Sequence, residues 1–128
     1  MRRTGLALSE GSVAVPLDTL TRERKLSDRI RRILRIGAQH QVDCFVVGLP
    51  LQTNGQVGER AELAQAFAAR LGDRTELPIH LVDERYTTVE AEQRLRSTGM
   101  SSQRIAEVID QASAVVILES WIAQRSEA

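Results

Sequence analysis

The chain has 128 residues, the length of one domain, and its 17 basic and 17 acidic residues give a formal net charge of zero, which excludes a global field that would draw it onto polyanions. Its single cysteine excludes an internal disulfide framework and a thiolate zinc site, and its four aromatic residues argue against an aromatic stacking platform for single-stranded nucleic acid. Because no apolar run approaches the ~20 residues of a membrane span and no signal-peptide pattern is found, we expect one cytoplasmic α/β or α+β domain over residues 1–128.

The first third of the chain predicts a hairpin and a helix. Two short β-like runs, 5–9 and 12–16, are separated by Glu10-Gly11, a pair that suits the turn of a hairpin. Apolar residues then recur at helical spacing from Leu26 to Gln39, with Ser27 as the candidate N-cap.

Basic residues are concentrated around this predicted helix, because seven of the seventeen fall between Arg22 and Arg35. We expect the arginines of the helix on its exposed surface: Arg29, Arg31, Arg32 and Arg35. Local basic density, rather than net charge, decides whether phosphate can be bound. An arginine-rich helix is nevertheless more often a solvated face than a nucleic-acid surface.

The middle of the chain predicts two strands with a loop and a helix between them. The apolar run 44–49, ended by Pro50, is typical of a strand buried on both faces, hence parallel and central in its sheet. A polar loop follows over 51–58, then an alanine-rich helix over 59–71, then a short buried strand over 78–82. The residues expected on or beside one stripe of this helix are Leu63, Ala66, Phe67, Arg70 and Leu71.

The last third of the chain predicts helices. Thr88 is the candidate cap of a helix that runs to about Leu95, and a further helical pattern covers 102–124 in one or two pieces. The two consecutive strand–helix crossovers favour a mixed sheet whose later strands are parallel. In such sheets ligands bind beyond the carboxyl ends of the parallel strands, which here are 48–50 and 82–84.

Two groups of carboxylates are candidates for chemistry. Asp83 and Glu84 follow a buried strand directly, and Mg²⁺ takes one or two such carboxylates together with substrate phosphate. The alternative is that Asp83 caps the following turn and Glu84 pairs with Arg85. Asp110 lies in a predicted helix among small residues, which leave room for an ion beside the sheet. The alternative interpretation of Asp110 is an ordinary exposed aspartate of an amphipathic helix, and the sequence pattern alone favours this interpretation.

Four segments, in this order, resemble the motifs of a known family. They are RRTGLALSE at 2–10, VVGLPL at 46–51 with Asn54-Gly55 behind it, VDERYTTVEA at 82–91, and DQASAVVIL at 110–118. The corresponding family motifs are K-R-I-G-V-A-V-S-D, V-V-G-L-P-L…D-G, D-E-R-L-T-T-x-E-A and D-x-x-A-A-x-x-I-L. The ordered set is similar to the YqgF (RuvX) group of RuvC-like proteins, which have the RNase H fold and are regarded as nucleases for the 5′ end of pre-16S rRNA.

This resemblance implies a mechanism and a set of site residues. Proteins of the RNase H fold bind divalent ions, Mg²⁺ or Mn²⁺, with acidic residues from the first strand, a later strand end and the last helix. By resemblance, Glu84 is the strand-end ligand and Asp110 the helix ligand, both catalytic, and Asp83 is a neighbour that binds or orients. The candidates for contact with backbone phosphates are Arg2, Arg3, Arg32 and Arg85.

The sequence departs from the family at its start. The family carries a first strand with D-x-G, including the first metal ligand, before the segment that resembles 2–10, whereas here Met1 stands directly before Arg2. We therefore expect an RNase H-like mixed sheet flanked by helices that lacks the first, central strand, with two unpaired strand edges in its middle. Either the start is placed too late in the sequence as written, which we favour, or the chain is catalytically inactive.

These observations together lead us to expect a Mg²⁺- or Mn²⁺-dependent nuclease that processes the 5′ end of pre-16S rRNA in the cytoplasm. For the chain as written, which lacks the first carboxylate of the family, we expect this activity to be absent. The alternatives are a non-catalytic nucleic-acid or ribosome-associated binding module, and a Holliday junction resolvase, which would share the site but act on branched DNA. We expect no membrane partner. The sequence does not distinguish RNA from DNA and does not indicate the oligomeric state or the number of metal ions.

Overall fold

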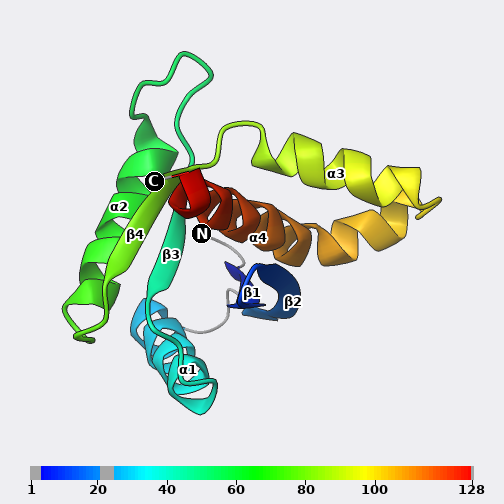
Figure 1. Ribbon diagram of the computed structural model, residues 1–128. Coiled ribbons are helices and arrows are strands. Elements are labelled where there is room, and N and C mark those ends of the chain that lie inside the picture. The colour runs from blue at the N-terminus through cyan, green and yellow to red at the C-terminus, as the bar shows by residue number, and fades with distance from the viewer. Residues whose placement is uncertain (1–3, 21–24, 128) are drawn as a thin grey trace.

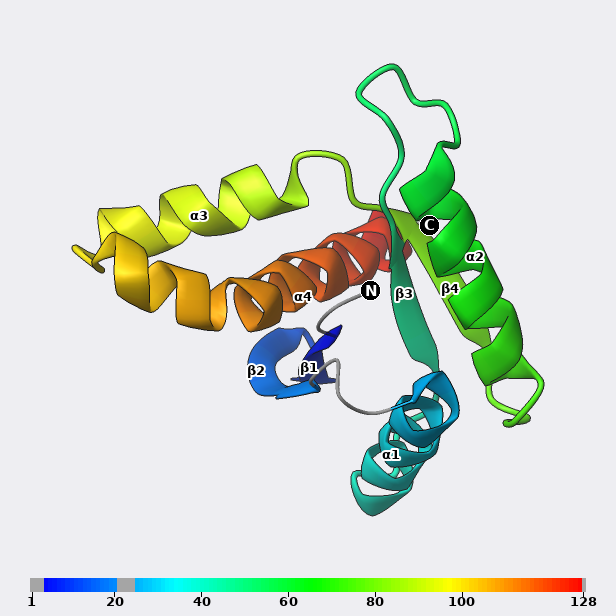
Figure 2. The same cartoon turned by 180° about the vertical axis from the view of Figure 1, so that it is seen from behind.

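The computed structural model describes residues 4–20 and 25–127 of the chain, which form two small β-sheets and four helices (Figures 1 and 2). The α/β class is therefore as predicted. Among the described residues, no helix is both long and apolar enough to cross a membrane. The elements in chain order are β1 (Thr4–Glu10), β2 (Val13–Leu20), α1 (Leu26–Gln39), β3 (Phe45–Leu49), α2 (Glu59–Gly72), β4 (Ile79–Asp83), α3 (Thr87–Ser97) and α4 (Ser102–Glu127).

Strands β1 and β2 form the predicted antiparallel hairpin, with Thr4 opposite Leu20. Gly11 in its turn has a φ of 60°, a left-handed conformation that glycine adopts without steric cost. Strand β2 is longer than predicted, because it continues past Pro16 to Leu20. Proline has no N–H for a ladder and is tolerated at bulges, and Pro16 lies opposite Ala7, where the register shifts.

Strands β3 and β4 form the predicted parallel pair, with Phe45 opposite Ile79 and Leu49 opposite Asp83. Helix α2 lies along this pair (Figures 1 and 2). The prediction that the strand is buried on both faces and central is wrong, since each residue of β3 is only half-buried. The reason is that, of the strands that the structure describes, only β4 pairs with β3, and the other edge of β3 borders a cavity.

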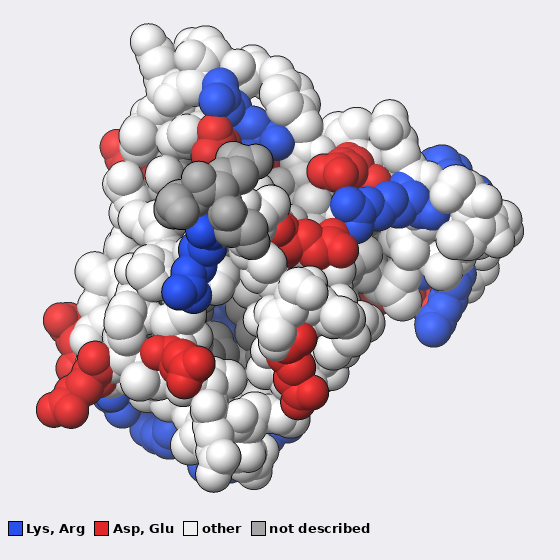
Figure 3. Space-filling model, in the orientation of Figure 1, with Lys and Arg blue, Asp and Glu red and all other residues white. Residues whose placement is uncertain are grey.

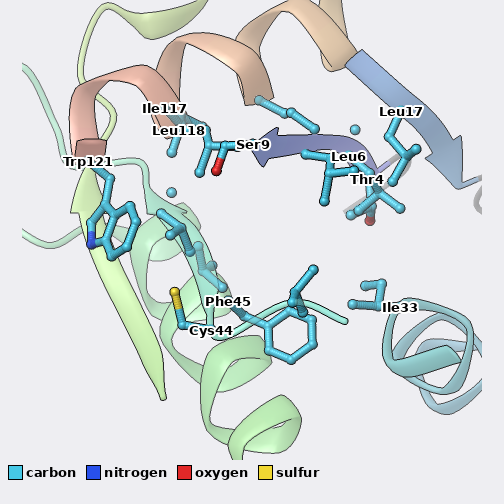
Figure 4. A pocket seen from close by; sticks show the side chains of 18 of the residues that line it. Thr4, Leu6, Ser9, Leu17, Ile33, Cys44, Phe45, Ile117, Leu118 and Trp121 are labelled. Atoms are coloured by element: carbon cyan, nitrogen blue, oxygen red, sulfur yellow. The ribbon is translucent and has the colours of Figure 1, made fainter. Parts of the chain in front are cut away.

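The strands form two separate two-stranded sheets rather than one continuous sheet, and in the described part of the chain β1 and β3 are not hydrogen-bonded to each other. A cavity of about 1280 Å³ separates them, and residues of β1, β3, α1, α2 and α4 line it. Figure 4 shows Ser9, Ile117 and Leu118 on one side of this cavity and Cys44 and Phe45 on the other. The prediction of two unpaired strand edges in the middle of the sheet is thus confirmed.

Helix α1 has its predicted bounds, but two predictions about its residues are wrong. Ser27 is not its cap, because the helix begins one residue after Lys25, which makes no side-chain capping bond. Arg29 is not on the exposed surface: it is buried, and its guanidinium donates to Thr4 Oγ1 at 3.5 Å. Arg29 lies one turn before Ile33, at the i, i+4 spacing that places two residues on one face, and it therefore shares the inward side of the helix. The core cluster at this end consists of Leu20, Ile30, Ile33, Phe67 and Leu71.

The later helices also depart from prediction in detail. The buried face of α2 is Ala61, Ala64, Phe67, Ala68 and Leu71, whereas Leu63, Ala66 and Arg70 are exposed. Small alanines on the inner face allow α2 to lie close to β3 and β4. Thr88 lies inside α3 rather than capping it, because Tyr86 precedes the first helical residue with a φ of 65°. The last helix, α4, is one continuous helix that crosses both sheets.

Candidate active site

Glu84 is presented at the carboxyl end of β4. Its backbone N–H donates to the carbonyl of Leu49 at 3.0 Å, so the parallel pairing with β3 extends to this residue. The side chain is half-buried beside Gly48, and a Cβ added to that glycine would lie 3.0 Å from the Glu84 carboxylate. Burial raises the pKa of Glu84, while the charge of Arg60 lowers it and that of Asp83 raises it. Because Gly48 has no side chain, there is room for the Glu84 carboxylate beside β3.

Asp110 is presented by α4 at the point where this helix meets β1. A Cβ added to Gly5 would overlap the backbone carbonyl of Asp110, so the helix and the strand are in direct backbone contact there. Asp110 is half-buried, and the interpretation of this residue as an ordinary exposed aspartate is wrong. The small residue at this contact is Gly5 of the strand, whereas Ala106, one turn before Asp110, is exposed.

Glu84 and Asp110 line the same cavity, although 26 positions separate them in the sequence. Their carboxylates are hard oxygen ligands, and Mg²⁺ commonly takes one or two of these from protein. The pair therefore fits a divalent cation. Within residues 4–20 and 25–127, no group of three His, Cys, Asp or Glu side chains lies together at a distance suited to metal binding. The described residues thus offer two carboxylates along this cavity, without a third acidic, histidine or cysteine side chain grouped with them.

Asp83 has a different environment from Glu84. It is exposed and does not line the cavity. Its carboxylate accepts hydrogen bonds from the backbone N–H and from Nε of Arg85, each at 2.9 Å, and these bonds lower the pKa of Asp83. The alternative in which Asp83 caps the turn is thus the observed one, but Arg85 pairs with Asp83 and not with Glu84.

The arginines predicted to contact phosphate are scattered. Arg85 also donates to the Thr53 carbonyl at 3.4 Å, and Arg32 lies 3.8 Å from the carboxylate of Asp18, away from the cavity. Arg2 and Arg3 lie outside the described residues. Basic and acidic side chains alternate over the face shown in Figure 3 and form no single basic patch there.

Arg60, whose positive charge lowers the pKa of Glu84, was not among the residues predicted for the site. It lies in the first turn of α2, is exposed to solvent, and lines the cavity together with Glu84 and Asp110. The sequence nevertheless contained an indication that Arg60 lies near the site. The predicted helix over 59–71 begins just beyond the carboxyl end of the strand over 44–49, the edge where the site was expected, and Arg60 is in its first turn.

Carboxylates from a parallel strand end and from a helix, facing one cavity, are typical of α/β proteins that bind a divalent cation beyond their strand ends. The chain belongs to the RuvX family, since the model of that family, described as Holliday junction resolvase, matches residues 1–124. The resemblance seen in the four sequence motifs is therefore confirmed, and with it the RNase H-like fold of the family.

Curated relatives agree with this family. A protein of Clavibacter michiganensis subsp. michiganensis is 44% identical over 121 residues, which cover 91% of this chain and 74% of the relative. A protein of Mycobacteroides abscessus is 40% identical over 126 residues, covering 96% of this chain and 76% of the relative. One of Lachnospira eligens is 40% identical over 130 residues, covering 98% of this chain and 93% of the relative. Each carries the name "Putative pre-16S rRNA nuclease".

Proposed function

We propose that this chain acts, as a single domain in the cytoplasm, as a divalent-metal-dependent nuclease that hydrolyses phosphodiester bonds at the 5′ end of pre-16S rRNA. The observation that carries the proposal is the placement of Glu84 and Asp110 along one cavity by two separate elements. The names of the relatives support the choice of substrate. Their identity of 40 to 44% over nearly the whole chain supports a shared reaction.

In the proposed reaction, Glu84 and Asp110 hold Mg²⁺ or Mn²⁺ through their carboxylate oxygens. When bound, such an ion activates water and stabilises the charge that develops on the phosphate oxygens. Glu84 has to be ionised to act as a ligand, and the positive charge of Arg60 favours that form against the effect of burial. Asp83 lies next to Glu84 in the chain but is held by Arg85. It therefore orients the end of β4 rather than binding the ion.

The proposal is tested with two single substitutions, Glu84→Gln and Asp110→Asn. Each removes a ligand charge with little change in size, so we expect metal-dependent cleavage of a pre-16S rRNA 5′ leader to fall by more than about 100-fold, since even residues that only support the ligands cost about 10–100-fold. Removal of metal with EDTA has to abolish cleavage by the unmodified chain. Glu107→Gln, an exposed carboxylate on the same helix as Asp110, is the matched control and retains activity. Circular dichroism establishes that each variant is folded.

The possible outcomes separate the proposal from its alternatives. Undiminished cleavage by both variants contradicts the assignment of the site. RNA binding without cleavage, independent of metal and lost when Arg31 and Arg35 are both changed to Glu, indicates a non-catalytic binding module. Preferential cleavage of a four-way DNA junction over the rRNA leader indicates the activity after which the family is described.

A further inference from the structure

The Arg85 side chain, which the sequence motif places next to Glu84, is already bound within the protein. Its Nε donates to Asp83 at 2.9 Å, its Nη2 lies 2.8 Å from the same carboxylate, and its Nη1 donates to the Thr53 carbonyl at 3.4 Å. Because Nε and Nη2 of this guanidinium both bind one carboxylate and Nη1 binds a carbonyl, few of its N–H groups are left to bind a phosphate.

Arg60 is in the opposite situation. It is exposed, lines the same cavity as Glu84 and Asp110, and forms no hydrogen bond or ion pair within residues 4–20 and 25–127. Its charge nevertheless acts on Glu84. An arginine that borders a pair of carboxylates while keeping its five donors unengaged is suited to bind an anionic group between them.

The loop that leads into α2 is held in a folded form. The amide of Gln52 donates to the Gln56 carbonyl at 2.9 Å, and the amide of Gly55 donates to the Gln52 carbonyl at 2.8 Å. Gly58, the last residue before α2, is packed so closely on the Gln52 side chain that an added Cβ would lie 2.7 Å from Nε2. Through its bond to Thr53, Arg85 ties this loop, and with it the first turn of α2, to the end of β4.

From this arrangement we propose that Arg60 binds the substrate phosphate beside the Glu84–Asp110 pair, and that Arg85 is a positioning residue that acts through the loop 50–58. The inference deepens the proposed function and depends on it only for the nature of the substrate, a nucleic acid. The sequence motif favours Arg85 as the residue that contacts phosphate. In the present proposal Arg85 has a structural role, and Arg60, which lies outside the motif, contacts the substrate.

The test is binding of a fluorescein-labelled pre-16S rRNA 5′ leader without divalent metal, measured by anisotropy over a salt series. Each phosphate contact contributes to the slope of log affinity against log salt concentration, and its loss lowers that slope by about one. We expect this decrease for Arg60→Gln and not for the matched control Arg70→Gln. Arg70 carries the same charge on the same helix about 15 Å further along its axis. Arg60→Lys keeps the slope, because it keeps the charge.

A double-substitution cycle separates positioning from direct contact. Arg85→Gln and Arg85→Lys both weaken binding if the fork of Arg85 positions the loop, since lysine cannot make the paired bonds to Asp83. If Arg85 acts through Arg60, Arg85→Gln has no further effect in a chain that already carries Arg60→Gln.

Two results would overturn the inference. An unchanged salt slope for Arg60→Gln shows that Arg60 does not contact phosphate, and a full effect of Arg85→Gln in the Arg60→Gln background shows that Arg85 acts on its own. Neither result depends on catalysis. Failure of the unmodified chain to cleave RNA would contradict the proposed nuclease while these binding slopes still decide the role of Arg60.

Discussion

Two glycines determine how closely the helix and strand that carry the candidate ligands approach their neighbours. Gly5 lies against the backbone of Asp110, and Gly48 lies against the side chains of Glu84 and Ile117. Neither has a positive φ, so their role is in packing and not in an unusual backbone conformation. A missing Cβ at each position therefore allows the two carboxylates to line one cavity from different elements.

Substitution of Gly5 by alanine tests this role. The new Cβ would overlap the Asp110 carbonyl, which is backbone and has no rotamer to move into, so we expect a loss of about 1–3 kcal/mol in the free energy of unfolding, or more. At a strand position without such an overlap, the same change would stabilise the folded protein, because alanine restricts the conformations of the unfolded chain. Urea denaturation measures the effect. Gly48→Ala is the comparison, and because it meets the tip of Ile117 it should cost less; equal stability of Gly5→Ala and the unmodified chain contradicts the argument.

Cys44, the single cysteine, provides a pH-dependent signal from the wall of the cavity. Burial raises the pKa of its thiol above the ordinary value of 9.0, the charge of Arg125 lowers it, and that of Asp43 raises it. The folded chain favours the protonated thiol. The stability that this preference contributes is fully present below the ordinary pKa of the thiol and is lost as the pH rises through its raised pKa in the folded chain. We expect the rate of alkylation by iodoacetamide to have its midpoint at higher pH in the folded chain than in urea.

The charges around Cys44 provide the controls for this measurement. Arg125→Gln should move the midpoint further up and Asp43→Asn should move it down, since each removes one of the charges acting on the thiol. A midpoint in the folded chain at or below that of the chain in urea is incompatible with the partial burial of the Cys44 thiol.

At the scale of elements, the sequence predicts where helices and strands lie better than it predicts which way they face. The bounds of α1 are as predicted, and those of β3, β4 and α2 agree to within one residue. The inward face of α2 was misassigned because periodicity favours its largest apolar residues, whereas close contact with β3 and β4 selects Ala61 and Ala64. Leu63 lines the cavity instead. Side-chain size at a helix–sheet contact depends on the partner, which periodicity does not describe.

In the candidate site, too, some features follow from the sequence and others depend on tertiary contacts. The motifs single out Glu84 and Asp110, and the structure places both along one cavity; their role as metal ligands stays a prediction. The position of Arg60 in the first turn of the predicted helix over 59–71 was a signal, but the role that we propose for it also depends on how the loop 50–58 folds back and on which donors of Arg85 are already bound. Both are tertiary contacts between segments that are distant in the sequence.

At the scale of the whole molecule, the main feature is the separation of the two sheets by a cavity. Phe45 donates its N–H to the Pro78 carbonyl, and Leu49 accepts from the N–H of Glu84, so these residues of β3 direct their backbone groups toward β4. In a parallel pair, successive residues direct their backbone groups to opposite edges. The N–H and C=O groups of Val46 and Gly48 therefore face the cavity, which both residues line.

This geometry predicts an alternating pattern of amide hydrogen exchange along β3. The amides of Val47 and Leu49 bond to β4 and should be protected. Those of Val46 and Gly48 should exchange roughly tenfold faster or more after correction for intrinsic rates, because no strand within residues 4–20 and 25–127 covers that edge. Exchange followed by two-dimensional NMR resolves the individual residues. The other edge of the cavity provides an internal comparison, because β2 is the one strand in the described part of the chain that pairs with β1. Uniform protection along β3 would show that its open edge is paired in solution and would contradict a two-stranded sheet.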